Sequence, residues 1–133
     1  AIATDHAPHA IEDKLREFDD AAFGISCIET AVPSLLTLVE RGELELGAMI
    51  RALTTGPERA FGIRRRFAGA GALAEGVSTD IVVLDPATRW TVEAPRLVSK
   101  GKNTPLDGTT LTGGVRAVVL GGKLAYEREA AVV

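Results

Sequence analysis

The chain has 133 residues, a formal net charge of −3 and 46% hydrophobic residues, which is enough for one domain with a core. The acidic balance excludes the basic surface that nucleic-acid binding requires. We expect no signal peptide, and no stretch approaches the roughly 20 consecutive apolar residues of a membrane span. The single cysteine excludes an internal disulfide and fits a reducing compartment, so we expect a cytoplasmic protein. From the charge and the apolar runs we expect no nucleic-acid or membrane partner.

The first 66 residues predict the end of an α/β unit. Residues 1–4, "AIAT", are an apolar run consistent with a buried strand that ends at Asp5. Residues 11–23 carry apolar side chains at helical spacing, and a charged surface loop with one helical turn fits them equally well. Helices are predicted to follow at residues 28–42, 46–55 and 57–62, the first stopped by Gly42 and the last starting at Pro57.

The composition changes after about residue 67. The stretch "GAGALAEG" is rich in glycine and breaks helices. Two strands are predicted at residues 80–86 and 89–94, the first with a turn after it. Two more are predicted within residues 115–127, joined at Gly121-Gly122, which is a usual hairpin signal. We therefore expect helices first and then a β region of four or five short strands.

The segment "TDHAPH", Thr4 to His9, gathers an aspartate and two histidines. The C-terminal end of a strand is where α/β barrels keep catalytic groups. Asp5 at that place can bind a divalent metal and move protons to and from an activated water. An aspartate that only caps the following turn fits the spacing equally well.

The two histidines of this segment are separated by Ala-Pro. Pro8 disfavours the helical conformation in the residue before it, so the rings of His6 and His9 are expected to point in different directions. One ring can be catalytic or bind substrate, and the other can be structural. His9 can hold a carboxylate on a small anionic substrate, or it can be an ordinary histidine of a surface loop.

Two other features have simpler interpretations. Cys27 has no neighbouring base that would activate it as a nucleophile, so we expect a small buried hydrophobe. The run Arg64–Arg66 predicts a solvated surface turn, with an anion contact as the alternative.

These segments, in order, resemble the C-terminal region of class I dihydroorotases, which are zinc enzymes of the amidohydrolase superfamily. "TDHAPH" is followed by "EDK", "AFGI" and "ETAVP", and "GALAEGVSTDIVVLDP" is similar to the superfamily's return from its barrel to its β domain. "WTVEA", "SKGKNTPLDGTTLTGGV" and "VLGGKLAYE" resemble dihydroorotase tails in order and spacing. The resemblance covers essentially the whole chain, with departures at Ala22, at Ser26-Cys27 and at Thr79.

The resemblance implies an α/β fold: the C-terminal part of a metal-dependent (β/α)8 TIM barrel plus a small β-sandwich. Residues 1–66 would be the last barrel strand with its helices, and residues 67–133 a portion of the sandwich. The family's other metal ligands come from earlier barrel strands, and no histidine follows His9 here. A complete barrel takes roughly 250 residues, so we expect the remainder of the barrel to lie outside this chain, which starts with Ala1 rather than Met.

The activity that the resemblance implies is the reversible interconversion of N-carbamoyl-L-aspartate and L-dihydroorotate, a step of de novo pyrimidine biosynthesis. Asp5 would be a ligand of a binuclear zinc site and the proton-transfer residue. His9 would bind the substrate carboxylate, backbone groups at Phe23 and Gly24 would contact the pyrimidine ring, and His6 would support the loop. The isolated chain is expected to be inactive, because most of the zinc ligands are absent from it.

Several rival interpretations stay open. Hydantoinases and allantoinases share the aspartate but usually lack a histidine at the position of His9, because their substrates lack the matching carboxylate. A non-catalytic dihydroorotase-like scaffold for aspartate transcarbamoylase is a second rival, against which the retention of Asp5 and His9 argues. A self-standing β-rich binding module is a third, and the site motif at the start of the chain argues against it. A homodimer or a complex with aspartate transcarbamoylase is the expected assembly.

Overall fold

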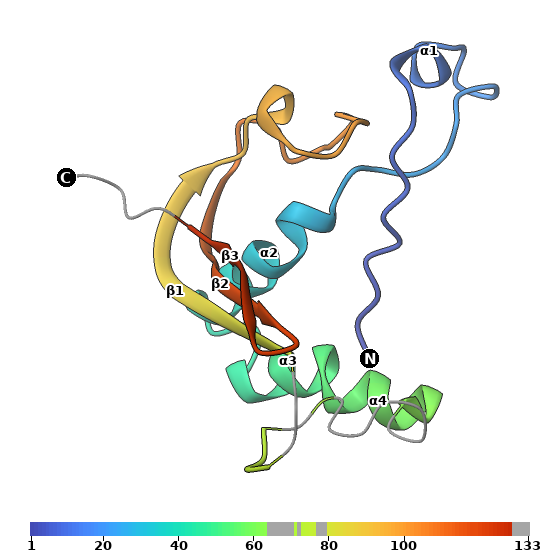
Figure 1. Ribbon diagram of the computed structural model, residues 1–133. Coiled ribbons are helices and arrows are strands. Elements are labelled where there is room, and N and C mark those ends of the chain that lie inside the picture. The colour runs from blue at the N-terminus through green and yellow to red at the C-terminus, as the bar shows by residue number, and fades with distance from the viewer. Residues whose placement is uncertain (64–70, 72, 77–79, 129–133) are drawn as a thin grey trace.

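The computed structural model describes residues 1–63, 71, 73–76 and 80–128 (Figure 1). The predicted boundary after residue 66, the arginine run Arg64–Arg66 and the departure at Thr79 lie outside these residues. Within them, no helix is long and apolar enough to cross a membrane.

Helices make up the first half of the chain, as predicted. They are α1 (Ile11–Lys14), α2 (Ile28–Glu40), α3 (Leu46–Leu53) and α4 (Thr55–Phe61). The helical turn of α1 inside a charged loop confirms the second of the two interpretations of that segment. Gly42 follows α2 with a φ of 73°, the left-handed conformation that stops a helix. The prediction that a helix starts at Pro57 is wrong by two residues, because α4 begins at Thr55.

The second half forms a three-stranded antiparallel sheet in the order β1-β2-β3. Its strands are β1 (Ile81–Thr91), β2 (Thr110–Leu120) and β3 (Lys123–Glu127), and a short 3₁₀ helix, η2 (Ala94–Arg96), follows β1. The hairpin at Gly121-Gly122 is confirmed, and both glycines have the positive φ that a tight turn of this hand needs. The described residues form this one sheet, so the β-sandwich stays a prediction.

The two strands predicted at residues 80–86 and 89–94 are one continuous strand, and this part of the prediction is wrong. The pairing of β1 with β2 shifts between Asp85 and Arg89, which places the expected turn inside the strand as an irregularity. The Asp85 carboxylate accepts bonds from the N–H of Ala87 (3.0 Å) and the hydroxyl of Thr88 (2.7 Å). These local bonds satisfy the backbone where the ladder is interrupted, so the chain continues as a strand.

The strand predicted at residues 1–4 is not formed, although the segment is extended. The N–H of Ile2 donates to the carbonyl of Ala52 in α3 (3.0 Å), and Ala1, Ala3 and Thr4 are exposed. A buried parallel strand needs a partner strand on each side. Just after this segment, His6 forms an isolated parallel bridge with Ile25.

Helix α2 is the structural centre of the described chain, because it packs on β2 and lies between the sheet and the extended N-terminal segment (Figure 1). Leu36 of α2 is 2% exposed and sits against Gly113 of β2. A Cβ at Gly113 would lie 2.9 Å from the Cβ of Leu36, so the glycine permits this close approach. Helix α2 is therefore packed closely on the sheet at Leu36.

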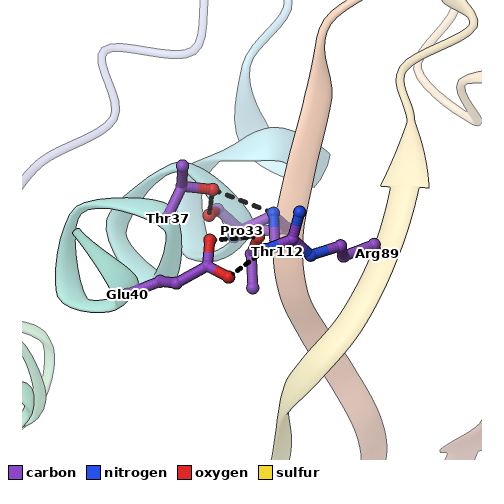
Figure 2. A network of polar contacts seen from close by, with 5 residues as sticks. All are labelled: Pro33, Thr37, Glu40, Arg89 and Thr112. Carbon is purple, nitrogen blue, oxygen red and sulfur yellow. Dashed lines mark hydrogen bonds and ion pairs between the residues drawn. The ribbon is translucent and has the colours of Figure 1, made fainter.

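A polar network joins the C-terminal half of α2 to the same sheet (Figure 2). The Thr37 hydroxyl donates to the carbonyl of Pro33 (2.9 Å) and accepts the N–H of Thr112 (2.9 Å). The Thr112 hydroxyl donates to Glu40 (2.7 Å), and Arg89 of β1 donates to the other oxygen of the same carboxylate. The Thr112 bond, followed by the Arg89 bond, lowers the pKa of Glu40.

This network makes stability depend on pH in a defined direction. A carboxyl whose pKa is lowered by folding adds stability above its ordinary pKa, and that stability is lost as the pH falls through the lowered value. We expect Glu40→Gln to be less stable than the parent protein at neutral pH, with the gap closing as glutamate is protonated. Thermal unfolding measured from neutral to acidic pH checks this. Glu43→Gln is the matched control. The prediction would be contradicted if the two variants lost the same stability and the difference between the Glu40 variant and the parent protein did not shrink at acidic pH.

Candidate functional site

The extended N-terminal segment passes the start of α2 (Figure 1), and His6 forms a parallel bridge with Ile25 there. Asp5 is exposed, and within the described residues its carboxylate makes no hydrogen bond or ion pair. The turn after it is served instead by Thr4, whose hydroxyl accepts the N–H of His6 (3.3 Å). The alternative in which Asp5 caps this turn is therefore wrong within the described structure, and the carboxylate is available for chemistry.

His6 is a hydrogen-bond acceptor for the start of α2. Its Nδ1 accepts the N–H of Cys27 (3.0 Å) and the N–H of Ile28 (3.2 Å). Since a backbone N–H only donates, Nδ1 carries no proton and the neutral ring is protonated at Nε2. The ring therefore occupies the capping position that the side chain of Cys27 leaves open.

His9 uses its ring in the opposite sense. Its Nδ1 lies 2.9 Å from the carbonyl oxygen of Ala7, which can only accept, so Nδ1 is protonated there. Nε2 is then the ring nitrogen left for a ligand. The two rings thus differ in their bonding, while the difference in direction expected from Pro8 stays a prediction.

Gly24 lies beside His9, so the structure brings these two candidate residues together. A Cβ at Gly24 would be 3.4 Å from Cε1 of His9 and 2.9 Å from the carbonyl oxygen of Ala7. With a φ of 108°, Gly24 also has a conformation that other residues rarely adopt. Phe23, the neighbour of Gly24 in the chain, is 88% exposed.

Two residues that the sequence analysis did not single out hold this pair. Asn103 accepts the N–H of His9 (3.4 Å) and donates from Nδ2 to the carbonyl of Gly24 (2.9 Å). Lys14 donates to the carbonyls of Ala22 (2.7 Å) and Gly24 (3.1 Å). Asn103 lies within the quoted tail "SKGKNTPLDGTTLTGGV", but nothing in its spacing indicates which loop it contacts.

The segment around Asn103 also contacts Pro8, His9 and Ser26. The carbonyl of Asn103 accepts the N–H of Ser26 (2.7 Å), and the Ser26 hydroxyl donates to the carbonyl of Gly101. A Cβ at Gly101 would lie 2.6 Å from Cβ of Pro8 and 2.9 Å from the nitrogen of His9. The C-terminal half of the chain is therefore built into the support of the N-terminal site.

Cys27 is not the buried hydrophobe that the sequence predicts. It is half-buried, and its thiol donates to the carbonyl of Thr4 (3.1 Å). The prediction of a simple apolar cysteine is wrong because the thiol makes a polar contact with the carbonyl of Thr4.

The described residues do not fit a complete metal site. Catalytic zinc usually takes three protein ligands, and in residues 1–63, 71, 73–76 and 80–128 no group of three or more histidine, cysteine or acidic side chains is arranged to hold a metal. His6 and His9 each have one ring nitrogen engaged with the backbone. The exposed carboxylate of Asp5 fits one position of such a site.

A cavity of about 420 Å³ lies apart from these residues. It is lined by Glu29, Trp90, Thr91, Glu93, Arg96, Leu97 and Arg128. None of the four predicted site residues contributes to its wall.

Comparison with known proteins finds similar proteins along nearly the whole chain. The model of the family described as "Amidohydrolase family" matches residues 1–125. A dihydroorotase of Anaeromyxobacter sp. (strain K) is 48% identical over 127 residues, covering 96% of this chain and 28% of that protein. A dihydroorotase of Geobacter metallireducens (strain ATCC 53774 / DSM 7210 / GS-15) is 42% identical over 128 residues, covering 96% of this chain and 29% of that protein. The chain spans less than a third of the length of these relatives.

Solved structures of hydantoinases share the fold. An L-hydantoinase (dihydropyrimidinase) from Arthrobacter aurescens matches with a TM-score of 0.83 and 30% identity, covering 98% of this chain and 29% of that one. A D-hydantoinase (dihydropyrimidinase) from Thermus sp. matches with a TM-score of 0.81 and 31% identity, covering 93% of this chain and 27% of that one.

Proposed function

Because the chain belongs to the amidohydrolase family, which confirms the predicted superfamily, we propose that it is the C-terminal part of a dihydroorotase. The observation that carries the proposal is the 48% identity to a protein named dihydroorotase along nearly the whole chain. The complete protein, meaning the longer chain that we propose contains these residues, would interconvert N-carbamoyl-L-aspartate and L-dihydroorotate in pyrimidine biosynthesis. The barrel and the sandwich would be completed by its other residues, with the domain boundary near residue 66.

In this proposal Asp5 is the proton-transfer residue. During ring opening, a water attacks the ring amide carbonyl, and the Asp5 carboxylate takes its proton as the new C–O bond forms. Asp5 then hands the proton to the ring nitrogen as the C–N bond breaks. Its free carboxylate supports this role. A binuclear zinc site, with Asp5 as one ligand and the others outside this chain, would supply Lewis acidity and a more acidic water when bound.

His9 and Gly24 bind the substrate in this proposal. When the His9 ring is protonated, it keeps the Nδ1 bond to Ala7 and can donate from Nε2 to the substrate carboxylate. The Gly24 carbonyl already accepts two donors, from Lys14 and Asn103. The N–H of Gly24, with the backbone of Phe23, is then the group we assign to the pyrimidine ring.

Asn103 gives a test of this substrate pair. Asn103→Ala removes one bond to His9 and one to Gly24, each worth about 1 kcal/mol net. We expect KM for dihydroorotate to rise on the order of 10-fold, with zinc content unchanged. Asp107→Ala is the matched control, because Asp107 accepts the N–H of Ala94 (2.7 Å) at the far end of the same segment. Equal KM changes in the two variants would contradict the role of Asn103.

A hydantoinase is the second candidate, favoured by the structural similarity to two enzymes of that name. His9 argues for dihydroorotate, because the carboxylate of dihydroorotate needs a binding partner and hydantoin has no such carboxylate. Homodimerisation and a complex with aspartate transcarbamoylase stay predictions.

A substrate panel with the purified complete protein decides between these activities. We expect kcat/KM for dihydroorotate to exceed that for hydantoin, dihydrouracil and allantoin by on the order of 100-fold or more, because the site would leave His9 unpaired with the other compounds. A preference for hydantoin would establish the second candidate. Zinc-free protein that binds aspartate transcarbamoylase without turnover would establish the scaffold.

A further inference from the structure

Asp5 has an unusual backbone conformation for a residue with a side chain. Its φ is 47°, and among the described residues it is the one non-glycine with a positive φ. Aspartate visits this left-handed region more readily than most residues, yet the conformation persists only where the surroundings impose it. Something in the structure must therefore hold the peptide units on either side of Asp5.

Both neighbours of Asp5 are tied to the same residue at the start of α2. On one side, the carbonyl of Thr4 accepts the thiol of Cys27 (3.1 Å). On the other side, Nδ1 of His6 accepts the N–H of Cys27 (3.0 Å) and of Ile28 (3.2 Å). The segment is tied once more by the N–H of Ala7, which donates to the carbonyl of Ile25 (3.0 Å).

Helix α2, which carries these contacts at its start, is itself attached to the sheet. The first N–H groups of a helix lack partners inside the helix, so the N–H groups at the start of α2 can donate to His6 without losing another bond. Further along, α2 is fixed to the sheet by Leu36 and by the network of Thr37 and Glu40. The bonds to α2 in this way link the position of Asp5 to the sheet through one helix.

We propose that His6 is a positioning residue for Asp5. Its imidazole, with the Cys27 thiol as the second tie, holds the Asp5 backbone in the left-handed conformation and so sets where the carboxylate points. The proposal rests on the proposed function for its kinetic consequences, but the effect on the Asp5 backbone does not depend on it.

Substitutions that move one acceptor atom test this in the complete protein. In His6→Asn, the side-chain oxygen takes the place of Nδ1, whereas in His6→Gln the oxygen lies near the place of Nε2. We expect His6→Asn to keep kcat for dihydroorotate within about threefold, and His6→Gln and His6→Ala to lose on the order of 10- to 100-fold, since a small misplacement of a catalytic group costs up to about 10². KM should change little, because His9 and Gly24 are held by other bonds.

Thr30→Val is the matched control for a general weakening of the helix start. It removes the bond from the Thr30 hydroxyl to the carbonyl of Cys27 (3.1 Å) without touching His6 or Thr4. We expect it to lower the melting temperature but to leave kcat within twofold. Equal kcat values for His6→Asn and His6→Gln would overturn the proposal, and so would a loss in Thr30→Val as large as that in His6→Gln.

A crystal structure of the His6→Gln protein separates this proposal from the proposed function. If the parent protein does not turn over dihydroorotate, the proposed function fails, and the backbone at Asp5 still decides the inference. A change of Asp5 φ from the left-handed region to negative values would support the tie through His6. An unchanged φ near 47° would overturn it.

Discussion

Replacing Asp5 by alanine in the complete protein is expected to abolish turnover in both directions. Proton transfer by a positioned side chain typically contributes a factor of 10²–10⁴, and loss of a metal ligand would add to this. Asp5 is exposed and free of hydrogen bonds within the described residues, so its loss removes no structural contact there. Steady-state kinetics with dihydroorotate and with carbamoyl aspartate measure the effect.

Asp5→Asn is the sharper form of this experiment. Asparagine has the same shape and also tolerates a positive φ, so the backbone is retained while the proton acceptor is lost. We expect it to be as inactive as the alanine variant. Asp19→Asn, an exposed aspartate of the following loop, serves as the control. Activity of either Asp5 variant within a few-fold of the parent protein would refute the assignment.

Replacing His9 by alanine is expected to raise KM substantially while leaving the zinc content unchanged. A hydrogen bond to a charged group is worth about 1.5–3 kcal/mol, which corresponds to a rise in KM of roughly 10- to 100-fold. Metal analysis of the same preparation accompanies the kinetics.

The control for His9 is an inhibitor that carries the dihydropyrimidine ring but no carboxylate. Its inhibition constant should be nearly the same for the parent protein and for His9→Ala. Loss of zinc from the variant would make His9 a metal ligand, and this would overturn the role that we assign to it.

The elements that the sequence predicts correctly are those with local signals. Helix α2 carries apolar residues at helical spacing and a glycine stop, and the hairpin carries two glycines where the turn needs positive φ. The strand at residues 1–4 was predicted from its apolar run, but a strand needs partners, and the segment has none on the described chain. At Asp85, local side-chain bonds continue a strand where Asp-Pro predicts its end.

The site shows the same division between local and distant information. The motif around Asp5 and His9 is contiguous, so the sequence analysis could select both residues. The contacts of Asn103 with His9 and Gly24 join residues more than seventy positions apart, and no spacing rule reveals them. The resemblance already implies that His6 supports the loop, but only the folded chain shows that its ring meets the start of α2.

The most direct test of the account compares the complete protein with the isolated 133-residue chain in one assay. Dihydroorotate hydrolysis and zinc stoichiometry are measured on both. Because catalytic zinc usually takes three protein ligands and we expect only Asp5 to be one here, we predict turnover for the complete protein and none for the isolated chain, with no tightly bound zinc pair on the latter. Turnover by the isolated chain with two tightly bound zinc ions would contradict the account, and so would a zinc-loaded complete protein that leaves dihydroorotate unchanged.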